Sequence, residues 1–190
     1  MNFEDKIRRA VKAACPAFAR TTEAFSLTFG VNPYPERTIS YYYVAALKEA
    51  LKPANVLLEI PVAGLRVGRH DNHIDALVFN DRCAVMAEFK RVWTPDHWEW
   101  LADDLKRLKT RACREISERF TDKRKRRCFI FLGADCWRLE VAQVWKTGIK
   151  TEKWKLPPVL LAGNRGYSTV WRETGKDYDG YYFTWALLPA

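Results

Sequence analysis

The chain has 190 residues, of which 48% are hydrophobic and 29% charged; this is ordinary globular usage and excludes a disordered or low-complexity protein. No apolar run approaches the roughly 18 residues of a membrane span, and the first residues, MNFEDKIRRA, mix acids and bases, so we expect neither a membrane helix nor a secretory signal. With 32 Lys and Arg against 23 Asp and Glu, the net charge of +9 favours a polyanionic partner such as nucleic acid.

Two helices are expected first. Apolar residues recur at helical spacing over residues 4–20, with basic side chains on the other faces. Residues 30–35 contain a glycine and two prolines and break the chain. A second helix is expected over residues 36–51, because Pro35 suits a first turn and Pro53 lies just past the end.

Three strands are expected next, over residues 55–62, 73–79 and 83–89, where apolar residues dominate. Residues 63–72 contain two glycines and are expected to form a loop. The segment Asn80-Asp81-Arg82 is a tight-turn signal, so the second and third strands should pair as a hairpin.

One long helix is then expected over residues 96–120, since apolar residues step by three or four along it. A basic turn leads into an apolar strand over residues 128–133. Residues 36–133 therefore follow the order helix, three strands, helix, strand, with an extra helix in front.

The last part of the chain, residues 134–190, is expected to be a β-rich C-terminal extension. Residues 134–145 favour a helix, and Pro157-Pro158 ends whatever precedes it. Strands are expected within this extension at residues 159–162, 167–173 and 181–188. Without an internal repeat or a long linker, we expect this extension to pack on the core within a single domain over residues 1–190.

The hairpin carries three charged residues that can act together. Asp75 lies inside its first strand, and Glu88 and Lys90 end its second. A two-residue turn at 81–82 sets a register in which Asp75 lies opposite Glu88 on one face of the sheet. Lys90 is two residues farther along and faces the same way. A turn one residue longer would move Glu88 to the other face, so the prediction depends on the register.

Two opposed carboxylates repel each other unless a cation compensates them. Mg²⁺ prefers oxygen ligands, needs few protein carboxylates and keeps positions for water and phosphate oxygens. Such an ion would polarise a phosphate and lower the pKa of a bound water. Lys90 could orient that water and stabilise the charge of the transition state.

With these residues in this element order, residues 36–133 resemble the PD-(D/E)XK nuclease superfamily. The resemblance rests on Asp75, on Glu88-Phe89-Lys90 and on the order of the elements around them. It implies an α/β restriction-endonuclease-like fold with an αβββαβ core, whose mixed central sheet is flanked by helices. It also implies an endonuclease or phosphodiesterase, a hydrolase that uses Mg²⁺ or Mn²⁺ held by Asp75 and Glu88.

Many members of that superfamily add a glutamate from the first core helix to the catalytic residues. Here the resemblance implies Glu36 or Glu49, and Glu36 is preferred because its helix end can point over the open sheet edge. One position departs from the motif, since Ile74 precedes the aspartate where the motif has proline.

Context gives the motif its specificity, because an acidic residue two positions before a lysine occurs three times in the chain, at residues 4–6, 88–90 and 104–106. Only the middle occurrence ends a predicted strand beside a strand with an aspartate. The structural alternative is a surface ion pair on an ordinary hairpin. His73 shares the face of Asp75 and is interpreted as an exposed strand residue, with phosphate contact as the alternative. For Glu59, approach to the metal and exposure to solvent are both left open.

A basic segment gathers most of the net charge. Residues 106–127 carry 11 basic and three acidic side chains and include an unbroken basic run. A solvated helix face is the plain interpretation, whereas phosphate contact is the functional one. The proposed nucleic-acid contacts are Lys106, Lys109, Arg114, Lys123, Arg124, Lys125, Arg126 and Arg127.

Tryptophans cluster directly after Lys90, at Trp93, Trp98 and Trp100. Trp98 belongs to the apolar stripe and is expected in the core, whereas the other two remain open between packing and stacking on unpaired bases. The five cysteines are odd in number, scattered and without a C-x-x-C pair, so we expect no disulfide framework and a cytoplasmic location.

The sequence thus predicts a metal-dependent nuclease, and family analogy favours DNA over RNA as its substrate. One alternative is a catalytically inactive relative that keeps the fold as a nucleic-acid-binding or protein-interaction module. Another is an unrelated α/β protein whose basic helix contacts RNA or an acidic partner. No membrane partner is expected, and a homodimer is left open.

Overall fold

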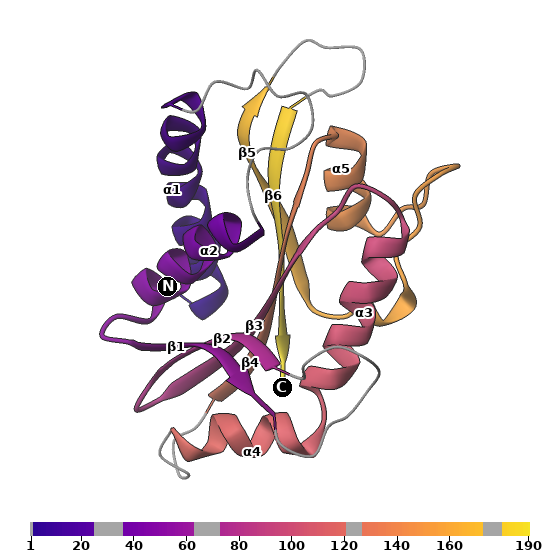
Figure 1. The fold of residues 1–190 in the computed structure, drawn as a ribbon. Coiled ribbons are helices and arrows are strands. Elements are labelled where there is room, and N and C mark those ends of the chain that lie inside the picture. The colour runs from indigo at the N-terminus through magenta and orange to yellow at the C-terminus, as the bar shows by residue number, and fades with distance from the viewer. Residues whose placement is uncertain (1, 25–35, 63–72, 121–126, 173–179) are drawn as a thin grey trace.

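The structure is a computed structural model that describes residues 2–24, 36–62, 73–120, 127–172 and 180–190. A six-stranded sheet in the order β1-β2-β3-β4-β6-β5 forms its centre. Helices cover both faces of this sheet: α1 and α2 lie on one side and α3 and α5 on the other (Figure 1). In chain order the elements are α1 (Phe3–Ala24), α2 (Glu36–Leu51), β1 (Asn55–Pro61), β2 (His73–Asn80), β3 (Cys83–Arg91), α3 (Asp96–Leu108), α4 (Arg111–Arg119), β4 (Arg127–Cys136), α5 (Leu139–Thr147), the 3₁₀ helix η1 (Pro158–Leu161), β5 (Asn164–Arg172) and β6 (Gly180–Pro189).

The sheet is mixed, because β3 and β4 pair parallel while the other neighbouring strands pair antiparallel. The connection from β3 to β4 carries α3 and α4. β6 inserts between β4 and β5, so two strands of the predicted C-terminal extension complete the central sheet. The expected α/β class with a mixed sheet flanked by helices is therefore confirmed.

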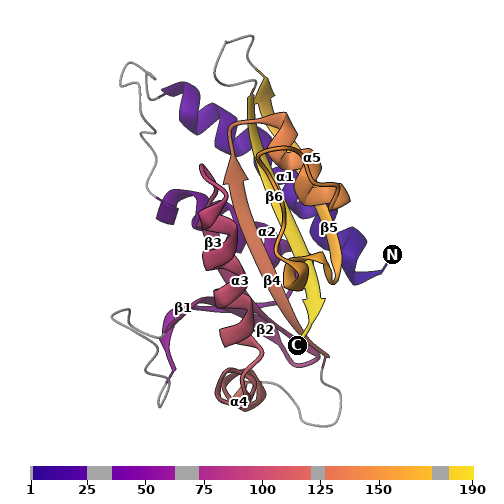
Figure 2. The same ribbon diagram turned by 90° about the vertical axis from the view of Figure 1, so that its right-hand side faces the viewer.

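Each face of the sheet packs against its own apolar core. Ala84 and Met86 of β3 pack with α3, whereas Val85, Ala87 and Phe89 pack with α1 and α2. Figure 2, viewed from the α3 side, shows α3 and α5 in front of the sheet and α1 and α2 behind it. Side chains alternate along a strand, so even-numbered positions of β3 face α3.

The helix expected over residues 96–120 is wrong, because two helices occupy that segment. α3 ends at Leu108 and α4 begins at Arg111. Thr110 between them has an extended backbone and accepts a hydrogen bond from the Cys113 amide at 3.5 Å. A threonine that caps a new helix in this way marks the end of the preceding helix. The spacing of apolar residues continues past Thr110, so that spacing alone predicts one helix.

The structure also differs from the expectations in the C-terminal part of the chain. Residues 134–136 extend β4, and the predicted helix begins only at Leu139. The strand expected at 159–162 is wrong, because Pro158 starts a 3₁₀ helix there, where proline removes a donor that a strand would need. The predicted segments 30–35, 63–72 and 123–126 lie outside the described residues. Among the helices of the described ranges, none has the length and apolar content needed to cross a membrane.

Candidate active site

The β2–β3 hairpin has the predicted register. Asn80 pairs with Cys83 and Ala76 pairs with Ala87, so Asp75 and Glu88 are the next opposed positions. The turn is held by the Asn80 side chain, whose Oδ1 accepts hydrogen bonds from the amides of Arg82 at 2.9 Å and Cys83 at 3.0 Å. This Asx-type turn fixes the number of turn residues, and therefore the face on which Glu88 lies.

Asp75 is locked at the end of this ladder. Its Oδ2 accepts a hydrogen bond from the backbone amide of Phe89 at 2.8 Å. The carboxylate thus accepts a hydrogen bond from the backbone of β3, as a carbonyl of a neighbouring strand would, and lies over β3 next to Glu88. This geometry agrees with the predicted sharing of one face by the two carboxylates.

Glu88 is one of the few buried charged residues, with 4% of its side chain exposed. Burial raises the pKa of Glu88 well above its usual value, and the neighbouring Asp75 raises it further through its charge and a side-chain hydrogen bond. Arg107 opposes this rise. The site therefore disfavours two full negative charges on Asp75 and Glu88, and Arg107 offsets this only in part.

Arg107 of α3 is a site residue that sequence reasoning missed. Its Nη2 lies 2.7 Å from Glu88 Oε1 and 3.1 Å from Asp104 Oδ1. Its Nη1 donates to the backbone oxygen of His73. The guanidinium thus joins α3 to both strands of the hairpin.

Lys90 lies on the same face and is held by α3 as well. Its Nζ is 3.7 Å from Asp104 Oδ2. Asp104 therefore bridges Lys90 and Arg107, and through Arg107 it is linked to Glu88. Asp104 and Arg107 are charged residues at positions i and i+3 beside the apolar stripe of α3. That spacing is the sequence signal from which they could have been predicted.

Glu59 and His73 extend the site towards the edge of the sheet. His73 Nε2 lies 3.1 Å from Glu59 Oε2 and 3.4 Å from Asp75 Oδ1. Glu59 has a φ of 52°, and it is skipped in the pairing of β1 with β2. This left-handed backbone is costly for a residue with a side chain, and it occurs where the carboxylate meets His73. The structure thus places the partly exposed His73 in contact with two carboxylates, whereas an exposed strand residue was expected.

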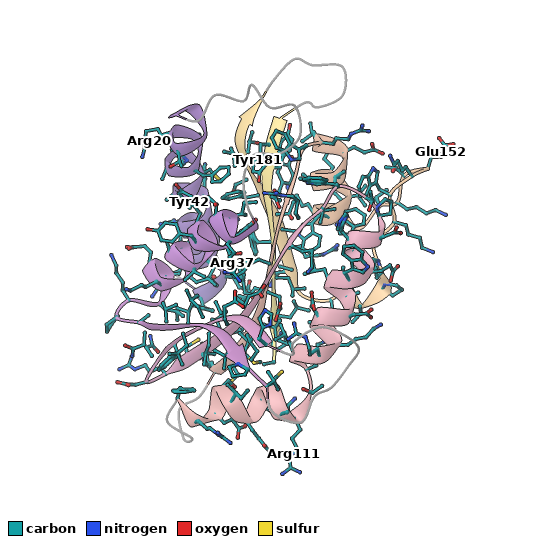
Figure 3. All side chains as sticks on the ribbon, viewed as in Figure 1. Arg20, Arg37, Tyr42, Arg111, Glu152 and Tyr181 are labelled. Carbon is teal, nitrogen blue, oxygen red and sulfur yellow. The ribbon has the colours of Figure 1, made fainter. Side chains whose placement is uncertain are left out.

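The two glutamates of α2 lie at opposite ends of the helix. Glu36 is its first residue, and its side chain lies outside the described part of the chain. The next residue, Arg37, labelled in Figure 3, reaches Glu59 Oε1 at 3.8 Å, so this helix end lies beside the site. Glu49 pairs with Lys52, about 20 Å farther along the helix. This end of α2 meets the turn of the hairpin, where Asn80 Nδ2 donates to the Leu51 carbonyl at 2.8 Å, so Glu49 does not lie at the Asp75–Glu88 end.

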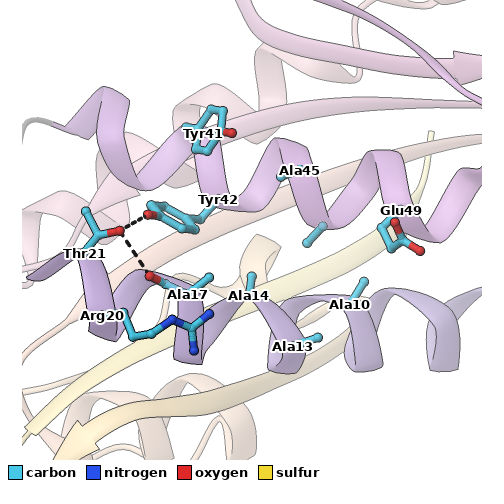
Figure 4. A pocket seen from close by; sticks show the side chains of 11 residues that line it. Ala10, Ala13, Ala14, Ala17, Arg20, Thr21, Tyr41, Tyr42, Ala45 and Glu49 are labelled. Carbon is cyan, nitrogen blue, oxygen red and sulfur yellow. Dashed lines mark hydrogen bonds between the residues drawn. The ribbon is translucent and has the colours of Figure 1, made fainter.

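A groove of about 750 Å³ runs between α1 and α2 (Figure 4). Alanines of α1 line it, and Tyr41 and Tyr42 of α2 border it. The groove belongs to the face of the sheet that Phe89 covers, not to the face of Glu88. Its charged side chains are Arg20 and Glu49, which carry opposite signs and offer no cluster of acid–base groups.

The described basic residues of the predicted nucleic-acid contact are exposed on α3, just after it, on α4 and at the start of β4. Lys106 pairs with Asp103 at 2.8 Å, and Lys109 caps the end of α3. Arg114 is exposed on α4, and Arg127 begins β4. Lys123, Arg124, Lys125 and Arg126 lie outside the described residues. The phosphate contacts of this segment thus stay a prediction.

No family model, no curated protein and no solved structure matches this chain. Within the described residues, no group of three or more His, Cys, Asp or Glu side chains is placed to hold a metal ion. The geometry of the hairpin and α3 is therefore the basis on which function is argued.

Proposed function

We propose that this protein is a metal-dependent nuclease with a restriction-endonuclease-like core, and that DNA is its substrate. The observation that carries the proposal is the pairing of Asp75 with Glu88 on one face of the hairpin, with Lys90 two residues farther along on the same face. At this site the three carboxyl groups of Asp75, Glu88 and Asp104 lie beside two cationic side chains, those of Lys90 and Arg107. An excess of carboxyl groups over cationic side chains favours a bound cation. The substrate class rests on the net charge of +9 and on analogy with the superfamily.

The donor set fits Mg²⁺ or Mn²⁺. Both ions take oxygen ligands, and Mg²⁺ usually binds through one or two carboxylates while water and phosphate fill the remaining positions. Asp75 and Glu88 supply those two carboxylates. When bound, the ion would polarise the phosphate and lower the pKa of a bound water.

The remaining residues of the site position and balance charge. Asp104 holds the Lys90 amine in place, so Lys90 stays oriented towards a phosphate and its attacking water. His73 lies between Glu59 and Asp75 and contacts both carboxylates. These groups sit on a hairpin and a helix, which position side chains more precisely than loops do.

One observation favours the second candidate, a catalytically inactive module with the same fold. Arg107 already places a positive charge against Glu88 and Asp104. A guanidinium that neutralises a carboxylate can replace a metal ion structurally without providing its chemistry. In that case the protein would bind nucleic acid without metal and would not cleave it.

Cleavage assays distinguish the two candidates. Plasmid, linear duplex, single-stranded DNA and RNA are incubated with Mg²⁺, Mn²⁺ or EDTA. The nuclease proposal expects cleavage of at least one substrate with a divalent cation and none in EDTA. Binding without cleavage under every cation condition supports the inactive module instead.

Replacing Lys90 with alanine is expected to lower the turnover number about 100-fold and to leave substrate affinity nearly unchanged. The amine would act on charge that develops in the transition state, so its loss costs little in the ground state. Turnover and affinity are measured on the best substrate found. Lys12→Ala, at an exposed position of α1, is the control, and full turnover in Lys90→Ala would exclude a catalytic role for Lys90.

The basic run is expected to contribute affinity without sequence preference. Replacing Arg124, Lys125 and Arg126 with alanine should weaken binding to all duplex sequences alike, because point charges contact phosphates rather than base edges. Each lost phosphate contact reduces the slope of log affinity against log salt by about 0.9. A salt titration in Ca²⁺ measures this slope, and an unchanged slope would mean that the run makes no phosphate contact.

A further inference from the structure

Two tryptophans at the turn from β3 into α3 are exposed. Trp93 is 43% and Trp100 is 54% exposed, whereas Trp98, Trp145, Trp154 and Trp185 are at most 4% exposed. Among the described residues, these two are the exposed large hydrophobic side chains between the end of β3 and the end of α3. They contribute two flat rings and no aliphatic surface, so the turn lacks the contiguous apolar patch of a protein-docking face.

Both rings are held by the protein. The ring of His97 meets that of Trp100 edge-on, with centroids 4.6 Å apart, and His97 Nδ1 accepts a hydrogen bond from the Thr94 amide at 3.1 Å. The guanidinium of Arg91 lies 5.6 Å from the centre of the Trp93 ring. Asp135 Oδ2 accepts a hydrogen bond from Arg91 Nε at 3.1 Å. Rings fixed in this way lose little conformational entropy when a ligand stacks on them.

The Trp100 ring belongs to the same flank of α3 as the candidate active site. Positions 97, 100, 104 and 107 lie along one stripe of a helix with 3.6 residues per turn. Asp104, which holds Lys90, is about 6 Å from Trp100 along the helix axis, and Arg107, which holds Glu88, is about 10 Å away. A polymer that touches Trp100 can therefore reach the hairpin carboxylates within about two helical turns.

We propose that Trp100 stacks on an unpaired base of a single-stranded nucleic acid whose backbone follows this flank of α3 towards Glu88 and Lys90. Every base has a π face, so stacking on fixed aromatic rings binds single strands with little sequence preference. In a duplex those faces are covered by neighbouring base pairs. The direction of the strand rests on the proposed nuclease function, whereas the stacking itself does not.

Fluorescence anisotropy with labelled oligonucleotides tests this proposal in EDTA and in Ca²⁺, so that no cleavage is required. The probes are a single strand, the same strand with abasic sites in place of its central bases, and the matching duplex. The variants are Trp100→Ala and Trp100→Phe, and Tyr41→Ala is the control, since Tyr41 is an exposed ring at 68% on α2. Circular dichroism checks that each variant is folded.

Trp100→Ala is expected to bind the intact single strand about tenfold more weakly than the wild type. Trp100→Phe should keep most of the affinity, because it keeps a ring, and Tyr41→Ala should match the wild type. The abasic strand should bind the wild type about tenfold more weakly than the intact strand, and Trp100→Ala should no longer distinguish the two strands. That coupling would show that the ring acts on the base.

Equal affinity of Trp100→Ala and the wild type for the intact strand would overturn the proposal, as would equal affinity of the wild type for intact and abasic strands. If the wild type binds none of the probes, the rings serve a different partner, such as a protein, and the proposal is also overturned. Ring-dependent binding without cleavage in Mg²⁺ would keep the stacking and reject the nuclease. If Trp100→Ala changes neither cleavage nor binding, the nuclease is kept and the stacking is rejected.

Discussion

Replacing Asp75 with asparagine, or Glu88 with glutamine, is expected to lower metal-dependent cleavage about 1000-fold. Each change removes a charged ligand from the proposed ion, and electrostatic stabilisation of this kind is the largest single contribution to many enzymatic rates. The double variant should be no worse than either single variant, because the two carboxylates act as one unit. Single-turnover rates on the best substrate measure all three effects.

Asp103→Asn is the matched control for these two variants. Asp103 is a carboxylate of α3 that pairs with Lys106 at 2.8 Å on the solvent side of the helix. Its variant should cleave at the rate of the wild type. Wild-type cleavage by Glu88→Gln would remove the hairpin from the active site, and a loss shared equally by Asp103→Asn would point to a general effect on folding or charge.

The hairpin was predictable because local chemistry determines its geometry. Asn80 supplies the turn with its own side chain, and the turn fixes the register over the strands that follow. Since side chains alternate with a period of two, the register then fixes the face of Asp75 and Glu88. The bounds of α2 follow from similarly local signals, the prolines on either side of it.

Asp104 and Arg107 were not predictable as site residues from the same local reasoning. Asp104 begins one of the two other acid-x-lysine matches in the chain, where it looked like a chance occurrence. Its role depends on how α3 rotates over β3, and the apolar stripe of the helix fixes that rotation only to within its own width. The ion pair with Lys90 therefore becomes visible only after the helix is packed.

Glu59 shows a second limit of sequence reasoning. The register of β1 with β2 places its position opposite Asp75, but nothing in the sequence indicates a φ of 52°. A non-glycine residue adopts that backbone only when its surroundings hold it there. The contacts with His73 at 3.1 Å and Arg37 at 3.8 Å come from β2 and α2, so they arise from tertiary structure.

Replacing Arg107 with methionine is expected to destabilise the protein by about 3 kcal/mol at neutral pH, because it leaves Glu88 and Asp104 without their guanidinium partner. In a chain of this size such a loss lowers the melting temperature by about 6–12 °C. Methionine keeps an unbranched apolar stem in place of the arginine stem but lacks the guanidinium, so the change mainly removes the charge and its hydrogen bonds. Thermal melts measure the effect, and Arg111→Met, whose side chain is 92% exposed on α4, should melt like the wild type.

The loss should depend on pH. A carboxyl group whose pKa is raised in the folded state stabilises the fold below its ordinary value of 4.5 and loses that contribution as the pH rises through the raised pKa. Arg107 opposes the rise in the pKa of Glu88, so without it the loss becomes larger. The difference between Arg107→Met and the wild type should therefore be small in acid and grow towards neutral pH. A difference that is constant with pH would mean that the side chain stabilises by packing alone.

Divalent cations then separate the nuclease from the inactive module. If Asp75 and Glu88 hold Mn²⁺, an ion that binds only the folded state stabilises it by mass action. Arg107→Met should gain more from Mn²⁺ than the wild type does, because the guanidinium no longer neutralises Glu88 and the carboxylate pair is left more negative. Adding Asp75→Asn to Arg107→Met should abolish that gain, since it removes one of the two ligands. Melting temperatures that Mn²⁺ leaves unchanged in both the wild type and Arg107→Met would show that the guanidinium is a structural partner of Glu88 and that no ion binds beside it.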